Sequence, residues 1–196
     1  MAMPKPHKKP LILEAAAQIV ADQGAAHLTI DAVAAAAGIS KGGVLYHFPS
    51  KQALLEGMLE RLLEEIAASN AELRTQHASA DNPALVARII EQHNQTPIQK
   101  AMERAILAAA AEDPNLLAPA HTEAANAFED AAAGSDRPEL SWVVLLAVEG
   151  LRFLEMLKLS PLSTAERERV HHQLLELASS SPTKIKQERQ ERVSGA

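Results

Sequence analysis

Side chains that could bind phosphate are concentrated between Thr29 and Lys51. They are the hydroxyls of Thr29 and Ser40, the phenol of Tyr46, the imidazole of His47 and the ammonium groups of Lys41 and Lys51. Proteins direct donors of these kinds at nucleic-acid phosphates. Lys51 also falls in the first turn of an expected helix, where unpaired backbone N–H groups favour an anion. The stretch therefore predicts a contact with nucleic acid.

Two short helices are expected to position these side chains. The first has its inner face at helical spacing, on Ile30, Val33, Ala34 and Ala37. Thr29 occupies its N-cap position and Asp31 places a negative charge in its first turn. Gly38 ends it, and Ser40 caps a second helix that runs to about His47. This is the layout of a helix-turn-helix unit.

Gly42 and Gly43 lie side by side near the start of the second helix. A glycine costs about 1 kcal/mol relative to alanine inside a helix, although less in the first turn. Without side chains, this surface could approach another molecule closely. The alternative is a tight crossing against a neighbouring helix.

The segment from Gly38 to Leu55, G-I-S-K-G-G-V-L-Y-H-F-P-S-K-Q-A-L-L, resembles the signature of TetR-family (tetracycline-repressor-like) transcriptional regulators. The preceding T-I-D-A-V-A-A-A-A-G follows the same pattern, and the resemblance covers roughly residues 10–65. It implies an all-α homodimer with an N-terminal DNA-binding domain. It also implies a larger C-terminal domain for effector binding and dimerisation.

By position, the resemblance implies that Ser40, Lys41, Gly42 and Gly43 face the major groove. It also implies that Thr29, Tyr46, His47 and Lys51 bind phosphates. Because the two glycines offer no side chains to base edges, Lys41, Val44 and Leu45 are expected to take a larger share of base reading.

The composition favours helices and excludes several kinds of site. Hydrophobic residues make up 47% of the 196 residues but aromatic residues only 3%, which suits helices packed through small side chains. The absence of cysteine excludes disulfides, thiolate zinc sites and cysteine nucleophiles.

We expect no metal and no cofactor. His171 and His172 would point roughly 100° apart on a helix and could not chelate one ion together. No apolar run approaches about 18 residues, so we expect a cytoplasmic protein without a membrane segment.

The net charge of −6 divides unevenly along the chain. Residues 1–52 hold five lysines against three acidic residues, a charge of +2, whereas the remainder holds 14 basic and 22 acidic residues, a charge of −8. Such asymmetry is expected of a protein that binds DNA through one part. A charge of +2 is weak evidence for DNA binding by itself, and it becomes useful evidence only if a dimer doubles it.

We predict three regions: a DNA-binding domain over 1–52 with a basic N-terminal arm, an effector-binding and dimerisation domain over 53–179, and a polar, disordered tail over 180–196. Lys5, Lys8 and Lys9 form the arm, for which a frayed terminus is the alternative. Proline and capping signals predict helices over about 11–23, 50–76, 83–94, 97–112, 114–133, 138–158 and 164–179, with Pro10 at the first helical position and Pro119 bending or interrupting its helix.

The segment 138–158 is apolar on nearly all sides, which predicts burial on more than one side. Together with 164–179 it could form half of a four-helix bundle between two subunits. The candidate interface residues are Trp142, Leu146, Leu151, Leu154 and Leu174. A helix buried only within its own chain is the alternative.

An effector pocket is expected by resemblance among the central helices. Its candidate lining residues are Met58, Leu62, Ile89, His93, Ile98, Met102, Ile106 and Phe128. Methionine adapts to irregular ligand shapes, and a histidine could supply a polar contact. Each of these positions could equally belong to the core, and His93 could be an exposed or satisfied histidine.

No catalytic motif is found: the sequence has no H-E-x-x-H, no phosphate loop, no dinucleotide glycine signature and no G-x-S-x-G. This absence argues against an enzyme, and the TetR-family resemblance implies a dimeric transcriptional regulator that acts as a repressor and is released from double-stranded operator DNA by a small-molecule effector. An enzyme with dispersed catalytic residues and a DNA-bending or scaffold protein without effector are the alternatives.

Overall fold

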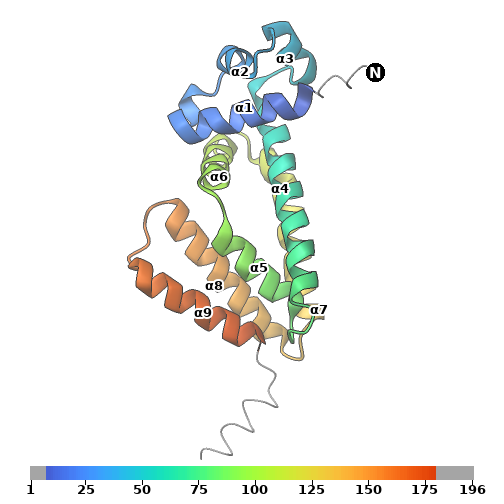
Figure 1. Cartoon of the computed structure of the whole chain (residues 1–196), viewed down its shortest axis with the longest axis vertical. Coiled ribbons are helices and arrows are strands. Elements are labelled where there is room, and N and C mark those ends of the chain that lie inside the picture. The colour runs from blue at the N-terminus through green and yellow to red at the C-terminus, as the bar shows by residue number, and fades with distance from the viewer. Residues whose placement is uncertain (1–7, 180–196) are drawn as a thin grey trace, which may run out of the picture. The chain divides into compact units, whose positions relative to one another are not determined.

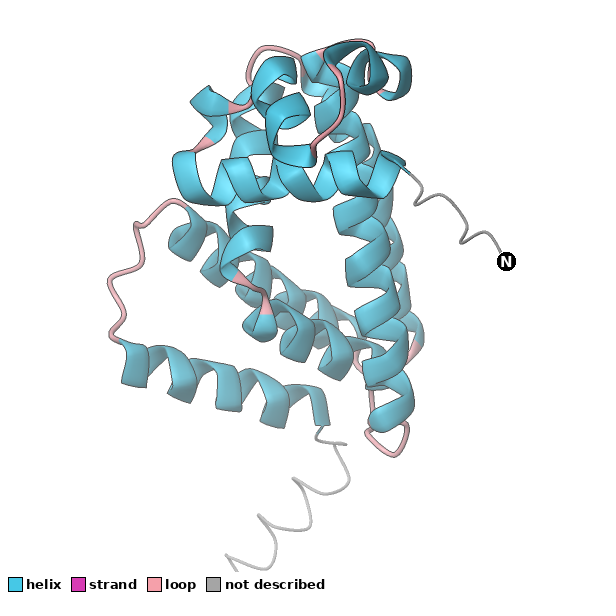
Figure 2. Cartoon of the chain, turned by 45° about the horizontal axis from the view of Figure 1, so that its top comes forward, coloured by secondary structure: helices cyan, strands magenta, loops and turns pink. Residues whose placement is uncertain are grey.

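A computed structural model describes residues 8–179 of the chain, and these residues form helices and loops without a strand (Figures 1 and 2). The predicted all-α fold is confirmed. In chain order the elements are α1 (Lys8–Gln23), the 3₁₀ helix η1 (Ala25–His27), α2 (Ile30–Ala37), α3 (Lys41–His47), α4 (Lys51–Gln76), α5 (Pro83–Asn94), α6 (Pro97–Ala110), the 3₁₀ helix η2 (Pro114–Leu117), α7 (Ala118–Ala133), α8 (Pro138–Met156) and α9 (Thr164–Ser179). No helix within residues 8–179 is both long and apolar enough to cross a membrane.

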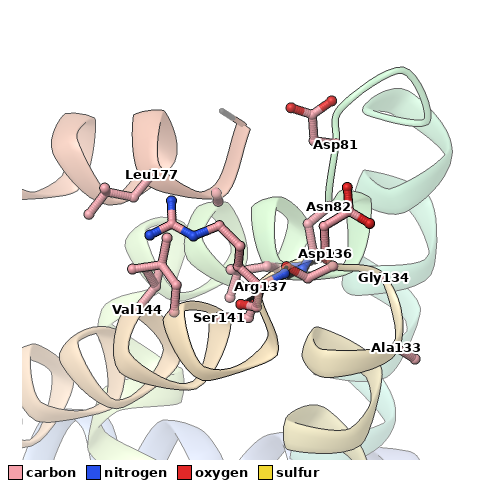
Figure 3. A pocket seen from close by; sticks show the side chains of 13 residues that line it. Asp81, Asn82, Ala133, Gly134, Asp136, Arg137, Ser141, Val144 and Leu177 are labelled. Carbon is pink, nitrogen blue, oxygen red and sulfur yellow. Dashed lines mark hydrogen bonds between the residues drawn. The ribbon is translucent and has the colours of Figure 1, made fainter. Parts of the chain in front are cut away.

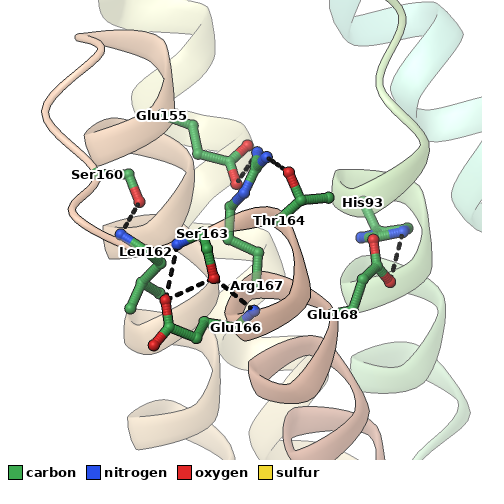
Figure 4. Close-up of polar contacts among 9 residues, drawn as sticks. All are labelled: His93, Glu155, Ser160, Leu162, Ser163, Thr164, Glu166, Arg167 and Glu168. Atoms are coloured by element: carbon green, nitrogen blue, oxygen red, sulfur yellow. Dashed lines mark hydrogen bonds and ion pairs between the residues drawn. The ribbon is translucent and has the colours of Figure 1, made fainter.

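Capping side chains set most of the helix starts. The hydroxyls of Thr29, Ser40 and Ser50 each accept a hydrogen bond from the backbone N–H three residues later, at 3.0–3.2 Å. Asn82 Oδ1 accepts from the Leu85 N–H at 3.1 Å in the same way. Thr96 with Gln99 and Ser163 with Glu166 form reciprocal capping boxes, the second of which is drawn in Figure 4. These starts agree with the predicted ones.

Several boundaries differ from prediction. Helix α1 begins at Lys8, so Pro10 is its third residue; a proline is tolerated there because the N–H groups of a first turn have no helical partner. Lys8 and Lys9 thus belong to α1, whereas the rest of the predicted arm and the tail 180–196 lie outside the described residues. The predicted interruption near Pro119 takes the form of η2 followed by α7.

The described chain divides into two compact units. Unit 1 comprises the described part of residues 1–65 together with 95–123, and unit 2 comprises 66–94 together with the described part of 124–196. Residues 95–123 therefore pack with the N-terminal helices, and α1 contacts both α2 and α6. The domain boundary placed at residue 52 from the sequence stays a prediction.

Phe48, which follows α3, anchors the helix-turn-helix segment to α4 within unit 1. Its ring is 3% exposed, and a Cβ built on Gly57 would lie 2.6 Å from Phe48 Cε1 and 3.4 Å from Leu13 Cδ2. Gly57 therefore has a packing role in the interior of α4, because any larger side chain would displace the ring. Val44, one turn before Phe48, is fully buried.

The core of unit 2 is formed by α5, α8 and α9, with one residue from α7. Its buried members are Leu85, Val86, Ile89, Ala131, Val144, Leu145, Val148, Leu174 and Ala178. Leu174 is only 7% exposed and packs inside this core. The expectation that Leu174 lies in an interface between subunits is therefore contradicted, because its side chain is covered by its own chain.

Two histidines stack where α5 meets α9. The rings of His93 and His171 lie 3.9 Å apart between centroids and 24° from parallel, and His93 Nε2 lies 3.7 Å from Glu168 Oε2 (Figure 4 draws the His93–Glu168 pair). Burial lowers the pKa of His171 below its ordinary value of 6.5, and the charges of His93 and His172 lower it further, whereas the Glu168 carboxylate opposes the shift.

This lowered pKa predicts that acid weakens the fold. The unfolded chain binds a proton at His171 more readily than the folded chain. The stability that depends on neutral His171 is therefore fully present above about pH 6.5 and is lost as the pH drops toward the pKa of the folded state. Urea unfolding at pH 7.5, 6.5 and 5.5 should show this decline, and His171→Gln should reduce it. His172→Gln, on the same helix but more exposed, is the matched control, and an equal reduction there would contradict the assignment.

Candidate nucleic-acid interface

Helices α2 and α3 are joined by a turn that depends on Gly38. This residue has φ +64°, in the left-handed region where a side chain is disfavoured. The N–H of Ile39 donates to the carbonyl of Ala34 at 3.0 Å, which closes the end of α2. Ser40 then caps α3. The turn thus takes only three residues between α2 and α3, and Lys41 and Gly42 at the start of α3 are exposed.

The two faces of α3 are sharply different. Val44 is 0% exposed, whereas Lys41, Gly42 and Tyr46 are exposed, with Tyr46 at 84%. This burial contradicts the expectation that the Val44 side chain reads bases, because a side chain without exposed surface does not reach a base edge. Leu45 is 36% exposed and remains a candidate.

The adjacent glycines have different physical roles. A Cβ on Gly42 would meet nothing within 4 Å, so this position is open to a partner. A Cβ on Gly43 would lie 2.8 Å from Ile39 Cγ2 and 3.2 Å from Ser40 Oγ, so this position is required by the turn itself. The approach of a partner to Gly42 stays a prediction, and Gly43 packs against the turn itself and not against a neighbouring helix.

The side chain of Lys41 pairs with a residue that sequence reasoning placed only as a helix-terminal charge. Lys41 Nζ donates to Asp31 Oδ2 at 3.0 Å, and the two side chains are 59% and 71% exposed. Their positions, ten residues apart on different helices, gave no periodic signal in the sequence. The pair links the first turn of α2 to the first turn of α3.

The remaining candidate phosphate ligands lie at the ends of the unit. Thr29 is exposed while its hydroxyl caps α2. The His47 ring is half-buried and meets Tyr46 edge-on, with 5.1 Å between centroids. Lys51 Nζ lies 3.5 Å from the carbonyl oxygen of Ala25, a long contact that leaves its ammonium exposed. The assignment of these side chains to phosphate binding stays a prediction.

Each unit contains a cavity, and neither is lined by a predicted effector residue. In unit 1 a space of about 410 Å³ lies among η1, the start of α4, α6 and η2, and Lys51 and Gln52 are among its lining residues. In unit 2 a space of about 390 Å³ is lined by polar side chains including Asp81, Asp136 and Arg137 (Figure 3). Within residues 8–179 no group of three or more His, Asp or Glu side chains is placed to hold a metal ion.

The eight predicted pocket residues do not share one environment. Ile89 belongs to the core of unit 2 and Phe128 packs against that core. His93 is engaged with His171 and Glu168, and Ile98 is 39% exposed. The other four, all buried in unit 1, are Met58, Leu62, Met102 and Ile106. The effector pocket stays a prediction.

Helix α8 carries one buried face and one exposed apolar face. Ser141, Val144, Leu145 and Val148 are buried, at the spacing of one helical face. The exposed apolar face comprises Trp142, Val143, Leu146, Phe153 and Leu154, continued by Leu157 directly after the helix, each 41–60% exposed. Three of the five predicted interface residues, namely Trp142, Leu146 and Leu154, lie on it, and Leu151 is half-buried. The assignment of this face to an interface between two subunits stays a prediction.

Comparison with known proteins agrees with this architecture. Residues 12–58 match the family model described as "Bacterial regulatory proteins, tetR family", and residues 83–179 match "Tetracyclin repressor-like, C-terminal domain". A TetR transcription regulator from Haloarcula marismortui superposes with a TM-score of 0.70 at 21% identity, covering 87% of this chain and 96% of that one. The multidrug binding protein EbrR, in a complex with ethidium, gives a TM-score of 0.63 at 24% identity, covering 89% and 100%.

A curated relative is similar over a shorter stretch. Nucleoid occlusion factor SlmA from Aliivibrio fischeri is 38% identical over 68 residues, which are 34% of this chain and 35% of that protein. The chain therefore matches only about a third of the length of this relative. The two family models, in contrast, take in both the helix-turn-helix unit and the C-terminal helices. The chain belongs to the TetR family of transcriptional regulators.

Proposed function

We propose that this protein is a dimeric repressor that binds double-stranded operator DNA through α2 and α3 and leaves it when a small-molecule effector binds. The observation that carries the DNA-binding part is the pair of faces on α3. Val44 is buried beneath it, while Ser40, Lys41, Gly42 and Tyr46 are exposed on the outside. A helix anchored on one face and polar on the other is suited to a major groove.

In this proposal the exposed groups divide into two roles. Lys41 reads base edges, and the open surface at Gly42 lets the backbone come close to the DNA. Thr29, Tyr46, His47 and Lys51 contact phosphates, which fix the register without carrying sequence information. Leu45 supplies an apolar contact of the kind that thymine methyl groups accept.

The two lysines should respond differently to truncation. Lys51→Ala should weaken binding to all duplexes and reduce the slope of log K against log salt by about 1 per subunit, because one phosphate contact is lost. Lys41→Ala should instead change which sequence is preferred in a selection from random duplexes. Fluorescence anisotropy over 50–300 mM salt measures the first effect. An unchanged sequence preference in Lys41→Ala would contradict the proposed contact between Lys41 and base edges in the major groove.

The dimer in this proposal forms through the exposed apolar face of α8 together with α9. An isologous pair matches the two-fold symmetry of an operator whose half-sites lie about 34 Å apart. Five exposed apolar side chains of α8, continued by Leu157 directly after the helix, form one patch, and an exposed apolar patch is typical of an interaction surface. Gly150 on the same helix is exposed and open, so a partner helix can approach its backbone.

A charge placed on this face should separate the subunits. Leu146 is 59% exposed, so Leu146→Glu should leave the folded monomer intact while an interfacial carboxylate becomes too costly to bury. Sedimentation at about 10 µM should show a monomer with native helicity and weakened operator binding. Leu11→Glu, a partly exposed leucine of α1, is the control and should remain dimeric. A dimeric Leu146→Glu protein would contradict this interface.

The effector part of the proposal rests on the C-terminal match and on fold relatives such as EbrR, whose structures contain ethidium or malachite green. A ligand shifts the equilibrium only if it prefers the conformer that does not bind DNA. A tenfold preference corresponds to about 1.4 kcal/mol.

Effector action can be tested with a dye and a compound library. A compound that raises the thermal unfolding midpoint of the protein without DNA should also weaken its binding to a labelled operator duplex, by at most about tenfold for the preference given above. Malachite green is the first probe, and a DNA-only titration controls for dye binding to the duplex. Compounds that stabilise the protein but leave DNA binding unchanged would favour the scaffold alternative.

A further inference from the structure

Asp31 is the only acidic residue between Leu28 and Lys51, the stretch that contains the helix-turn-helix unit. Its carboxylate is 71% exposed and lies two residues from Thr29, a candidate phosphate ligand. An exposed carboxylate beside a surface that meets a polyanion opposes binding, since like charges repel within a Debye length of about 8 Å. A residue placed here solely for binding strength would be neutral or basic.

The hydrogen bond between Asp31 and Lys41 links this carboxylate to a candidate base-reading side chain. Its Oδ2 accepts a hydrogen bond from Lys41 Nζ at 3.0 Å, across from the first turn of α2 to the first turn of α3. An exposed pair of this kind contributes little to stability, so the ammonium can turn toward another acceptor at little cost. The ammonium also has three donors, so it can keep Asp31 while it donates to the DNA.

Phosphates and base edges compete differently for this ammonium. A phosphate oxygen carries a full negative charge and is repelled by Asp31 when it approaches Lys41. The O6 and N7 acceptors of guanine are neutral and suffer much less repulsion. The carboxylate therefore penalises a contact between Lys41 and the backbone more than a contact between Lys41 and a base.

We propose that Asp31 is a specificity-determining residue, which reserves Lys41 for base edges by repelling phosphates that approach its ammonium. The proposal rests on the proposed DNA-binding function and deepens it. It assigns to Asp31 a role in discrimination between operator and other DNA, beyond its place in the first turn of α2.

The test compares two duplexes. One is a 30-bp duplex recovered from a random pool by selection with the wild-type protein, and the other is a scrambled duplex of the same composition. Asp31→Asn should raise affinity for the scrambled duplex and leave or lower affinity for the selected one, so that their ratio falls about fivefold or more, the lower end of the discrimination of one good base contact. Thermal unfolding and circular dichroism establish that the variant is folded.

Two further variants separate this role from a general charge effect. Glu14→Gln removes one negative charge from an exposed position of α1 and should leave the ratio unchanged. In a Lys41→Ala background, Asp31→Asn should change the ratio less than twofold, because its partner is gone. The selected duplex is then recovered with the Lys41→Ala protein.

The outcomes are distinct. Equal changes in both affinities would show that Asp31 acts only through net charge and would overturn the proposal, as would an unchanged pair of affinities. A ratio that falls equally in the Lys41→Ala background would show that Asp31 acts without Lys41, which also overturns it. Failure of the wild-type protein to bind any duplex in a salt-dependent manner would instead overturn the DNA-binding function itself.

Discussion

The arrangement of the surface around α3 depends on the burial of Val44 and Phe48 beneath it. A helix of seven residues is not stable alone, because nucleation fixes several residues for few hydrogen bonds. Its orientation is set instead by these two apolar side chains, and the Phe48 ring fits against Gly57 of α4. With this face buried, the opposite side of α3, which carries Lys41, Gly42 and Tyr46, is exposed.

This constraint matters because the chain as a whole is acidic. With a net charge of −6, attraction to DNA cannot come from the total charge and has to come from a few local cations and backbone amides. In the proposed interface Lys41 supplies such a cation, and the open surface at Gly42 lets the DNA approach the backbone. In our proposal Asp31 beside Lys41 limits the strength of this attraction and so favours discrimination over affinity.

Helix α8 in unit 2 also has one buried side and one exposed side. Its inner face, including Val144, Leu145 and Val148, completes the core with α5 and α9, whereas its outer face exposes Trp142 and Leu146. Burial of the inner face holds unit 2 together, whereas the outer face is the one that we propose to pair with a second copy of the chain.

The sequence by itself determined the all-α class, most helix starts and the helix-turn-helix unit, because caps such as Thr29 and Ser40 act on N–H groups three residues away. It did not determine which apolar residues are covered. Tertiary packing decided that Val44 and Leu174 are buried in their own chain, that Gly43 serves the turn while Gly42 stays open, and that residues 95–123 pack with the N-terminal helices. It also brought Asp31 to Lys41. These outcomes depend on segments far apart in the chain, whose contacts leave no periodic pattern in the sequence.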